Sequence, residues 1–104
     1  MILTTTDTPP GYVITKILGP VRGSLAQGTA SLGAIASSVA QTESEEYTNL
    51  LEGARREAEK RMFEHAKRLE ADGVVGIRYE SNPIGAAHAI ESLVYGTAVK
   101  MRPE

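Results

Sequence analysis

Hydrophobic residues along this chain of 104 residues repeat with two different periods. Near the start and the end, β-branched and aromatic residues run together or alternate with small and polar ones, which is typical of strands. In the middle, apolar residues recur every three or four positions, which is typical of a helix. The pattern predicts strands near both ends of the chain and helical segments between them.

The N-terminal part predicts two strands. A short edge strand is expected at residues 2–6, and the turn residues at 9–11 separate it from residues 12–18, which read YVITKIL. Gly19 and Pro20 interrupt this second strand. Because proline cannot donate a hydrogen bond to a central ladder, these two residues indicate a bulge, a bend or a strand end.

Residues 23–42 carry no charge and consist mainly of Ala, Ser and Gly. Such a composition suits a flexible linker, but apolar residues fall on one side of a helical projection. They are Leu25, Thr29, Leu32, Ile35, Ala36 and Val39. A helix is the favoured interpretation, although Gly28 and Gly33 weaken it, and its small polar face would allow another backbone to approach closely.

A second, longer helix is predicted from Thr42 to about Ala71. Thr42 with Glu45 matches a capping box, and Asp72-Gly73 matches a glycine stop. The apolar stripe comprises Tyr47, Leu50, Leu51, Ala54, Ala58, Met62 and Leu69. Three pairs place an acid four residues before a base, which stabilises a helix surface. These pairs are Glu52 with Arg56, Glu57 with Arg61, and Glu64 with Arg68.

The C-terminal block predicts an antiparallel hairpin. Its strands are residues 74–80 and 89–100, and its loop contains Asn82, Pro83 and Gly85. The second strand has no clean polar face, which indicates burial on both sides. Since the chain has little left to cover the second side, this pattern predicts a homo-oligomer.

Composition limits the function classes. A chain of this length predicts a single domain, residues 1–104. A net charge of −2 gives little electrostatic support for binding nucleic acid, and the absence of cysteine removes disulfides and thiolate metal sites. The N-terminus lacks the features of a signal peptide, and no apolar run is long enough to span a membrane. A cytoplasmic protein without nucleic-acid or membrane partners is expected.

Several segments together resemble the YbjQ-like family, whose members are labelled heavy-metal-binding domains. The matching segments are GPVRG at 19–23, the long helix, VVGIRYES at 74–81 and the closing VYGTAVK. The resemblance implies a two-layer α+β subunit with an antiparallel sheet packed on one long helix, similar to a dodecin subunit. It also implies a ring-forming homo-oligomer, a pentamer, with no established activity. Residues 23–43 depart from the family, whose members carry a longer and more charged segment there.

Two histidines are the candidate metal ligands. His65 falls on the apolar stripe of the long helix, and His88 lies before the last strand. Each is interpreted either as a ligand or as an ordinary packed or exposed histidine. One chain cannot form a site from two histidines, because structural metal sites use three or four ligands. A ring could instead gather one histidine from each subunit.

Phe63 lies among charges on the outer face of the long helix. It is interpreted as an exposed aromatic residue or as a subunit anchor, and Tyr95 in the last strand is the other candidate for an oligomer interface.

No catalytic residue and no cofactor-binding motif is predicted, since neither a P-loop nor a GxSxG motif occurs. The favoured function is a non-enzymatic homo-oligomer that binds heavy-metal ions or a small ligand between subunits. The alternative is a scaffold ring that binds a protein partner without a metal, and a small enzyme is the least favoured.

Overall fold

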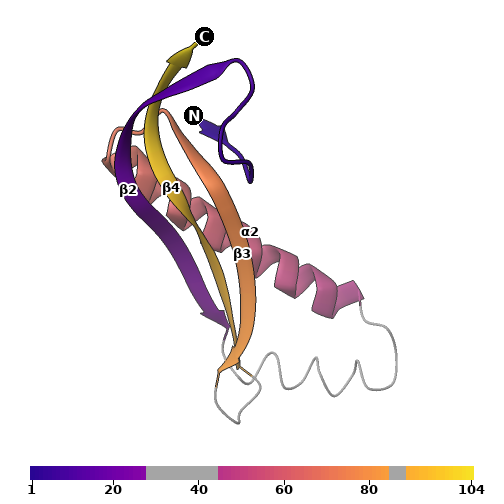
Figure 1. Ribbon diagram of the computed structural model, residues 1–104. Helices are drawn as coiled ribbons and strands as arrows, with labels where there is room; N and C mark the ends of the chain where they lie inside the picture. Colours follow the sequence, from indigo (N-terminus) through magenta and orange to yellow (C-terminus); the bar gives the residue numbers. More distant parts are fainter. Residues whose placement is uncertain (28–44, 85–88) are drawn as a thin grey trace.

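Over the residues that the structure describes, a four-stranded sheet carries a helix across one of its faces (Figure 1). The computed structural model describes residues 1–27, 45–84 and 89–104. The strands are β1 (Ile2–Leu3), β2 (Tyr12–Gln27), β3 (Gly73–Ile84) and β4 (Ala89–Pro103), and the helix is α2 (Glu45–Arg68). The strand order is β1-β3-β4-β2. The predicted α+β class is confirmed.

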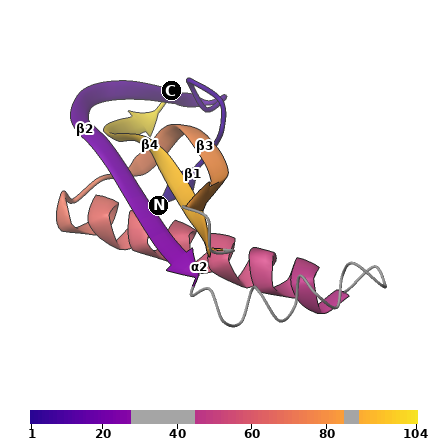
Figure 2. The same cartoon turned by 90° about the horizontal axis from the view of Figure 1, so that it is seen from below.

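The helix and the sheet form two layers, with α2 crossing one face of the strands (Figure 2). β3 pairs antiparallel with β4, which confirms the predicted hairpin. β2 also pairs antiparallel with β4, whereas β1 pairs parallel with β3. The sheet is therefore mixed rather than wholly antiparallel. Within the described ranges, no helix is both long enough and apolar enough to cross a membrane.

β2 follows one of the alternatives left open at Gly19 and Pro20, the bulge, and extends well beyond residues 12–18. It continues through Gly19 and Pro20 as a bulged strand, with register shifts against β4 and a φ of +127° at Gly19. Its last residues, 24–27, pair with 90–93 of β4. The predicted helix is wrong for these residues, because pairing with a long central strand outweighs a weak helical periodicity. The rest of that predicted helix, with Thr42, lies outside the described residues.

α2 ends at Arg68, earlier than predicted, and Glu70 closes it in a left-handed conformation, with φ +60°. The N–H of Glu70 donates to the carbonyl of Lys67, and the N–H of Ala71 donates to the carbonyl of Ala66. These are the two bonds of a Schellman motif. Gly73 is not the helix stop that the sequence predicts. It lies in β3, where a Cβ would collide with Met101 and the Ile2 carbonyl.

The core between sheet and helix is built mainly from small and medium side chains. From α2 it includes Ala58 and Met62, which lie on the predicted stripe, and Ala66, which was not predicted, whereas Leu69 of the stripe is exposed. The strands contribute Val21, Val74, Ile77, Val94 and Ala98. Gly23 allows α2 to approach β2, because a Cβ there would collide with the backbone at Ala58 and Met62.

The opposite face of the sheet is covered at one end only. Val75, Val99 and Met101 are buried there against Ile2, Tyr12 and Ile14. The prediction that the chain could not cover this side is therefore wrong near the termini, where the N-terminal segment and the start of β2 fold over it. Further along the same face, Tyr95 remains 37% exposed.

The predicted hairpin loop is also shorter in the structure. Asn82 and Pro83 belong to β3, and Pro83 pairs with Ile90. Proline is tolerated there because β1 pairs with only the first two residues of β3, so the outer side of the strand carries no ladder at Pro83. Gly85 and His88 lie outside the described residues.

The helix surface carries fewer of the predicted ion pairs. Nε of Arg61 lies 3.4 Å from Oε1 of Glu57, so this predicted pair is present. Glu52 pairs with Arg55 instead of with Arg56; its Oε1 lies 3.2 Å from Nη1 of Arg55. Among the described ion pairs, none joins Glu64 to Arg68. Exposed pairs of this kind contribute little to stability.

Candidate functional site

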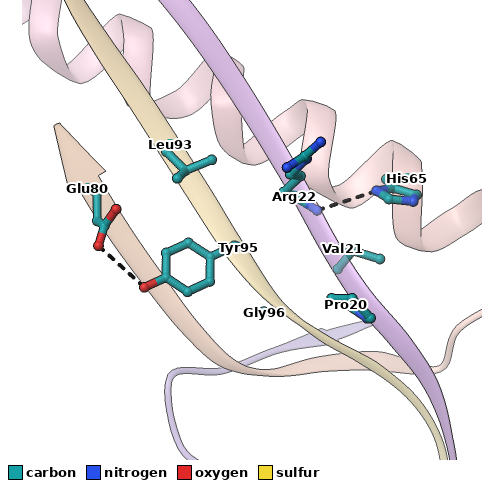
Figure 3. A pocket seen from close by; sticks show the side chains of 8 residues that line it. All are labelled: Pro20, Val21, Arg22, His65, Glu80, Leu93, Tyr95 and Gly96. Carbon is teal, nitrogen blue, oxygen red and sulfur yellow. Dashed lines mark hydrogen bonds between the residues drawn. The ribbon is translucent and has the colours of Figure 1, made fainter. Parts of the chain in front are cut away.

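A groove of about 560 Å³ lies on the sheet around Tyr95 (Figure 3). It crosses from β2 over β4 to β3, and α2 contributes one residue at the β2 edge. The lining residues are Pro20, Val21, Arg22, His65, Glu80, Leu93, Tyr95 and Gly96. Most of the lining is apolar, and its volume falls in the range of small-molecule sites.

The strand register brings the polar groups of the groove together. Arg22 lies directly opposite Tyr95 across the β2–β4 pair, so both side chains are on the face that points away from α2. The Tyr95 hydroxyl lies 3.4 Å from Oε1 of Glu80 on β3, to which it donates. An aromatic ring therefore separates a guanidinium on one flank from a carboxylate on the other.

These groups suit binding and orientation of a ligand. Arg22 offers several hydrogen-bond donors, Glu80 offers acceptors, and the Tyr95 hydroxyl can do both. Pro20, Leu93 and the Tyr95 ring offer an apolar surface between them. A small molecule with an apolar body and a charged or polar end would match this arrangement.

His65 makes a specific contact at the edge of this groove. Its Nδ1 lies 3.4 Å from the backbone nitrogen of Arg22, whose N–H donates to it. The imidazole is half-buried between α2 and β2, which agrees with its predicted place on the apolar side of the helix. His88, the other predicted ligand, lies outside the described residues, so the two histidines are not brought together in the described part of the chain.

The described residues do not fit a heavy-metal site within one chain. Across residues 1–27, 45–84 and 89–104, no group of three or more His, Cys, Asp or Glu side chains is placed to hold an ion. A histidine that binds a metal usually donates its other ring N–H to an acceptor. Nδ1 of His65 faces a donor instead, so its surroundings are those of an accepting nitrogen.

Phe63 is less isolated than the sequence predicts. Its ring is half-buried, and Nζ of Lys67 lies 5.8 Å from the ring centroid, within the range of a cation–π contact. Its role as a subunit anchor stays a prediction, as does that of Tyr95. Sedimentation of Phe63→Ser would test it, because an unchanged assembly would contradict an anchor.

Of the eight lining residues, sequence reasoning singled out only His65 and Tyr95, and it missed both charged members of the groove, Arg22 and Glu80. Both are charged residues in predicted strands, and Arg22 lies within the GPVRG segment, which is the one signal that could have drawn attention to it. Neither could be connected to Tyr95 without knowing the registers of β2 and β3 against β4.

Comparison with known proteins places the chain among close relatives. Residues 1–102 match the model of the YbjQ family, described as "Putative heavy-metal-binding". UPF0145 proteins from Methanoculleus marisnigri and Thermosipho melanesiensis are 43% and 39% identical; the alignments cover 99% and 100% of this chain and 98% of each relative. A crystal structure of a protein of unknown function in the DUF74 family, from Pediococcus pentosaceus, has a TM-score of 0.61 at 21% identity and 98% coverage of both chains. That similarity supports the fold.

Proposed function

Since this chain belongs to the YbjQ family, we propose that it is a non-enzymatic homo-oligomer that binds a small ligand in a groove between subunits. The observation that carries the proposal is the groove around Tyr95, which combines an apolar surface with three polar groups. The groove is open on the side facing away from α2. A neighbouring subunit laid over this face would complete it.

The shape of the chain supports assembly. The Cα radius of gyration is 16.6 Å, whereas a compact domain of this length has about 13 Å. Large apolar side chains also remain accessible, including Ile17 at 69% and Tyr95 at 37%. Stable monomers rarely leave extended apolar surfaces uncovered, so a second copy over the open face would stabilise both.

A head-to-tail ring, the pentamer that the family resemblance implies, suits the charges. Arg22 and Glu80 lie on opposite flanks of the groove, on β2 and β3. In a head-to-tail ring, a different surface of the next subunit lies over the groove, and that surface can complement Arg22 on one flank and Glu80 on the other. Such complementarity favours a closed ring over like-to-like pairing of the same flank.

The proposal concerns a small organic ligand rather than a metal ion, because the described residues offer no ion-holding group.

The scaffold alternative depends on the uncharged segment at 24–41. Its first residues are committed to β2, and residues 28–41 lie outside the described ranges. No observation in the described part of the chain favours that alternative, which stays a prediction.

The first experiment is native mass spectrometry of untagged protein, with and without anilinonaphthalene sulfonate, whose aromatic body and anionic group match the Tyr95 ring and Arg22. We expect the mass spectra to show a closed ring that binds the dye saturably. In a separate thermal unfolding experiment, the dye should raise the melting temperature of the protein. Arg22→Gln and Tyr95→Ser should each weaken dye binding, whereas Tyr79→Phe, on the helix side of the sheet, should not. A monomer, or dye binding that all three variants leave unchanged, would contradict the proposal.

A further inference from the structure

β2 lies at one edge of the sheet, and edge strands normally present unpaired backbone groups. Along an antiparallel edge strand, alternate residues direct their N–H and C=O groups outward. Residues 20, 22 and 24 form such a series. Pro20 has no N–H, the N–H of Arg22 donates to Nδ1 of His65, and the carbonyl of Ser24 accepts from Nη1 of Arg61 at 2.7 Å.

The two capping side chains come from adjacent turns of α2. Arg61 and His65 are four residues apart, so they lie on one side of the helix and are separated by about 6 Å along it. Arg22 and Ser24 are about 6.7 Å apart along their strand. The two spacings agree closely enough for each side chain to reach one backbone group. Gly23 lies between those groups and lets the helix come close, since a Cβ there would lie 2.8 Å from Cβ of Arg61.

This contact determines which nitrogen of His65 carries its proton. A neutral imidazole has one donor and one acceptor nitrogen, so acceptance at Nδ1 leaves the proton on Nε2. A metal at Nδ1 would displace the Arg22 N–H. A metal at Nε2 would move the proton to Nδ1, where it would face another donor. Either mode of binding removes the cap.

We infer that His65 and Arg61 cap the outer edge of β2 and that His65 is not a heavy-metal ligand. The caps occupy one outward backbone group of Arg22 and one of Ser24, and they thereby oppose strand addition by another chain at residues 22–24. The structural partner of His65 agrees with the absence of an ion-holding group among the described residues. The inference does not depend on the proposed ligand or on the number of subunits.

The test compares two substitutions of His65 by hydrogen exchange of the Arg22 amide, read by mass spectrometry with single-residue fragmentation. In His65→Gln, the amide oxygen can still accept from Arg22, whereas His65→Leu removes the acceptor. We expect exchange at Arg22 to be about tenfold faster in His65→Leu, and close to wild type in His65→Gln. Equal exchange in all three proteins would overturn the cap.

The same three proteins, without tags, are titrated with Zn²⁺ and followed by native mass spectrometry. We expect equal Zn²⁺ uptake in all three, because His65 does not take part. Saturable uptake in a fixed ratio to subunits that both variants lose would overturn the inference, whatever the exchange result. Dye binding at the groove is read separately, so failure of the proposed function would leave these two readouts unaffected.

A double variant tests the consequence for the edge. His65→Leu with Arg61→Met uncovers both backbone groups, and we expect larger species in sedimentation velocity. His65→Gln with Arg61→Lys keeps an acceptor and a donor in place, and it should sediment like the wild type. If the two double variants are both folded and sediment alike, His65 and Arg61 do not protect the edge of β2.

Discussion

Glu70 ends helix α2 in a conformation that glycine usually adopts, with φ +60°. A side chain with a Cβ costs about 1–2 kcal/mol in this region, because the Cβ approaches the following carbonyl oxygen. The two hydrogen bonds of the Schellman motif hold the residue there despite that cost. The native sequence therefore retains strain at this position.

Glu70→Gly should raise the free energy of unfolding by about 1 kcal/mol, because glycine relieves the strain at the cap. Urea unfolding of the two proteins would measure the difference. Glu70→Ala is the matched control, since alanine removes the carboxylate but keeps the Cβ, and it should leave stability nearly unchanged. If alanine stabilised as much as glycine, the charge of Glu70 and not its backbone would be responsible.

Tyr79 links β3 to α2 through its hydroxyl, which donates to Oε2 of Glu59 at 3.0 Å. Burial, together with the hydrogen bond and the negative charge of Glu59, raises the pKa of Tyr79 above its ordinary value of 10.0. The folded protein therefore favours the neutral phenol. Its contribution to stability is fully present below pH 10.0 and is lost as the pH rises through the raised pKa.

Unfolding free energies measured from about pH 8 to about pH 12 should show this loss. Because Tyr79 is 46% exposed, we expect a small effect. Tyr79→Phe cannot ionise, so its stability should fall less steeply over this interval than that of the wild type. Identical pH profiles for the two proteins would show that folding does not raise the pKa of Tyr79.

At the scale of elements, the close approach of α2 to β2 holds the layers together. Gly23 makes it possible, because a Cβ there would collide with the carbonyl oxygen of Ala58 and the backbone nitrogen of Met62. Backbone atoms in a packed helix cannot move aside as a flexible side chain can. The position of the helix over the sheet, and with it the caps on β2, depends on this glycine.

Gly23→Ala should destabilise the protein by about 3 kcal/mol, because the helix must shift to make room. Gly53 provides the control. It lies within α2, and a Cβ there would meet nothing within 4 Å. Gly53→Ala should therefore stabilise the protein by about 1 kcal/mol through helix propensity alone. Thermal unfolding of both variants would show opposite shifts, and a stabilising Gly23→Ala would contradict the packing described here.

At the scale of the whole molecule, one face of the sheet is divided between two environments. Near the termini, Val99 and Met101 are buried by the chain itself, whereas Tyr95 further along β4 remains accessible. A ring of subunits, as proposed, would cover the second part. The groove and the subunit contact would then occupy the same surface.

Tyr95→Asp should therefore shift the assembly toward monomers in sedimentation velocity, since a buried unpaired charge is costly at an interface. Tyr79→Phe is the control on the helix side, and it should not change the assembly. A Tyr95→Asp protein that stays folded and fully assembled would show that subunits meet elsewhere.

Much of the fold was predictable because the relevant signals are local. The 3.6-residue period around Ala54, Ala58 and Met62 predicts α2, and the β-branched runs predict the three long strands. Errors arose where a distant segment decided the outcome. Ser24–Gln27 forms strand because β4 lies beside it, and Gly73 is needed for its contacts with β1 and Met101 rather than for ending a helix.

The candidate site was predictable only in part. Tyr95 and His65 stood out as single residues, but the groove joins Arg22, Glu80 and Tyr95 from three strands. The partner of His65 is a backbone N–H that lies 43 residues earlier in the chain. No periodicity reports such a pairing, since strand register depends on how the whole sheet assembles.

Local patterns and motifs along the chain suffice to predict the long helix, most of the three long strands and the family. Which face of the sheet stays open, which charges flank Tyr95 and what His65 contacts follow only from the folded chain. These features arise from contacts between segments that are far apart in sequence. Their geometry exists only once β2, β3 and α2 have packed around β4.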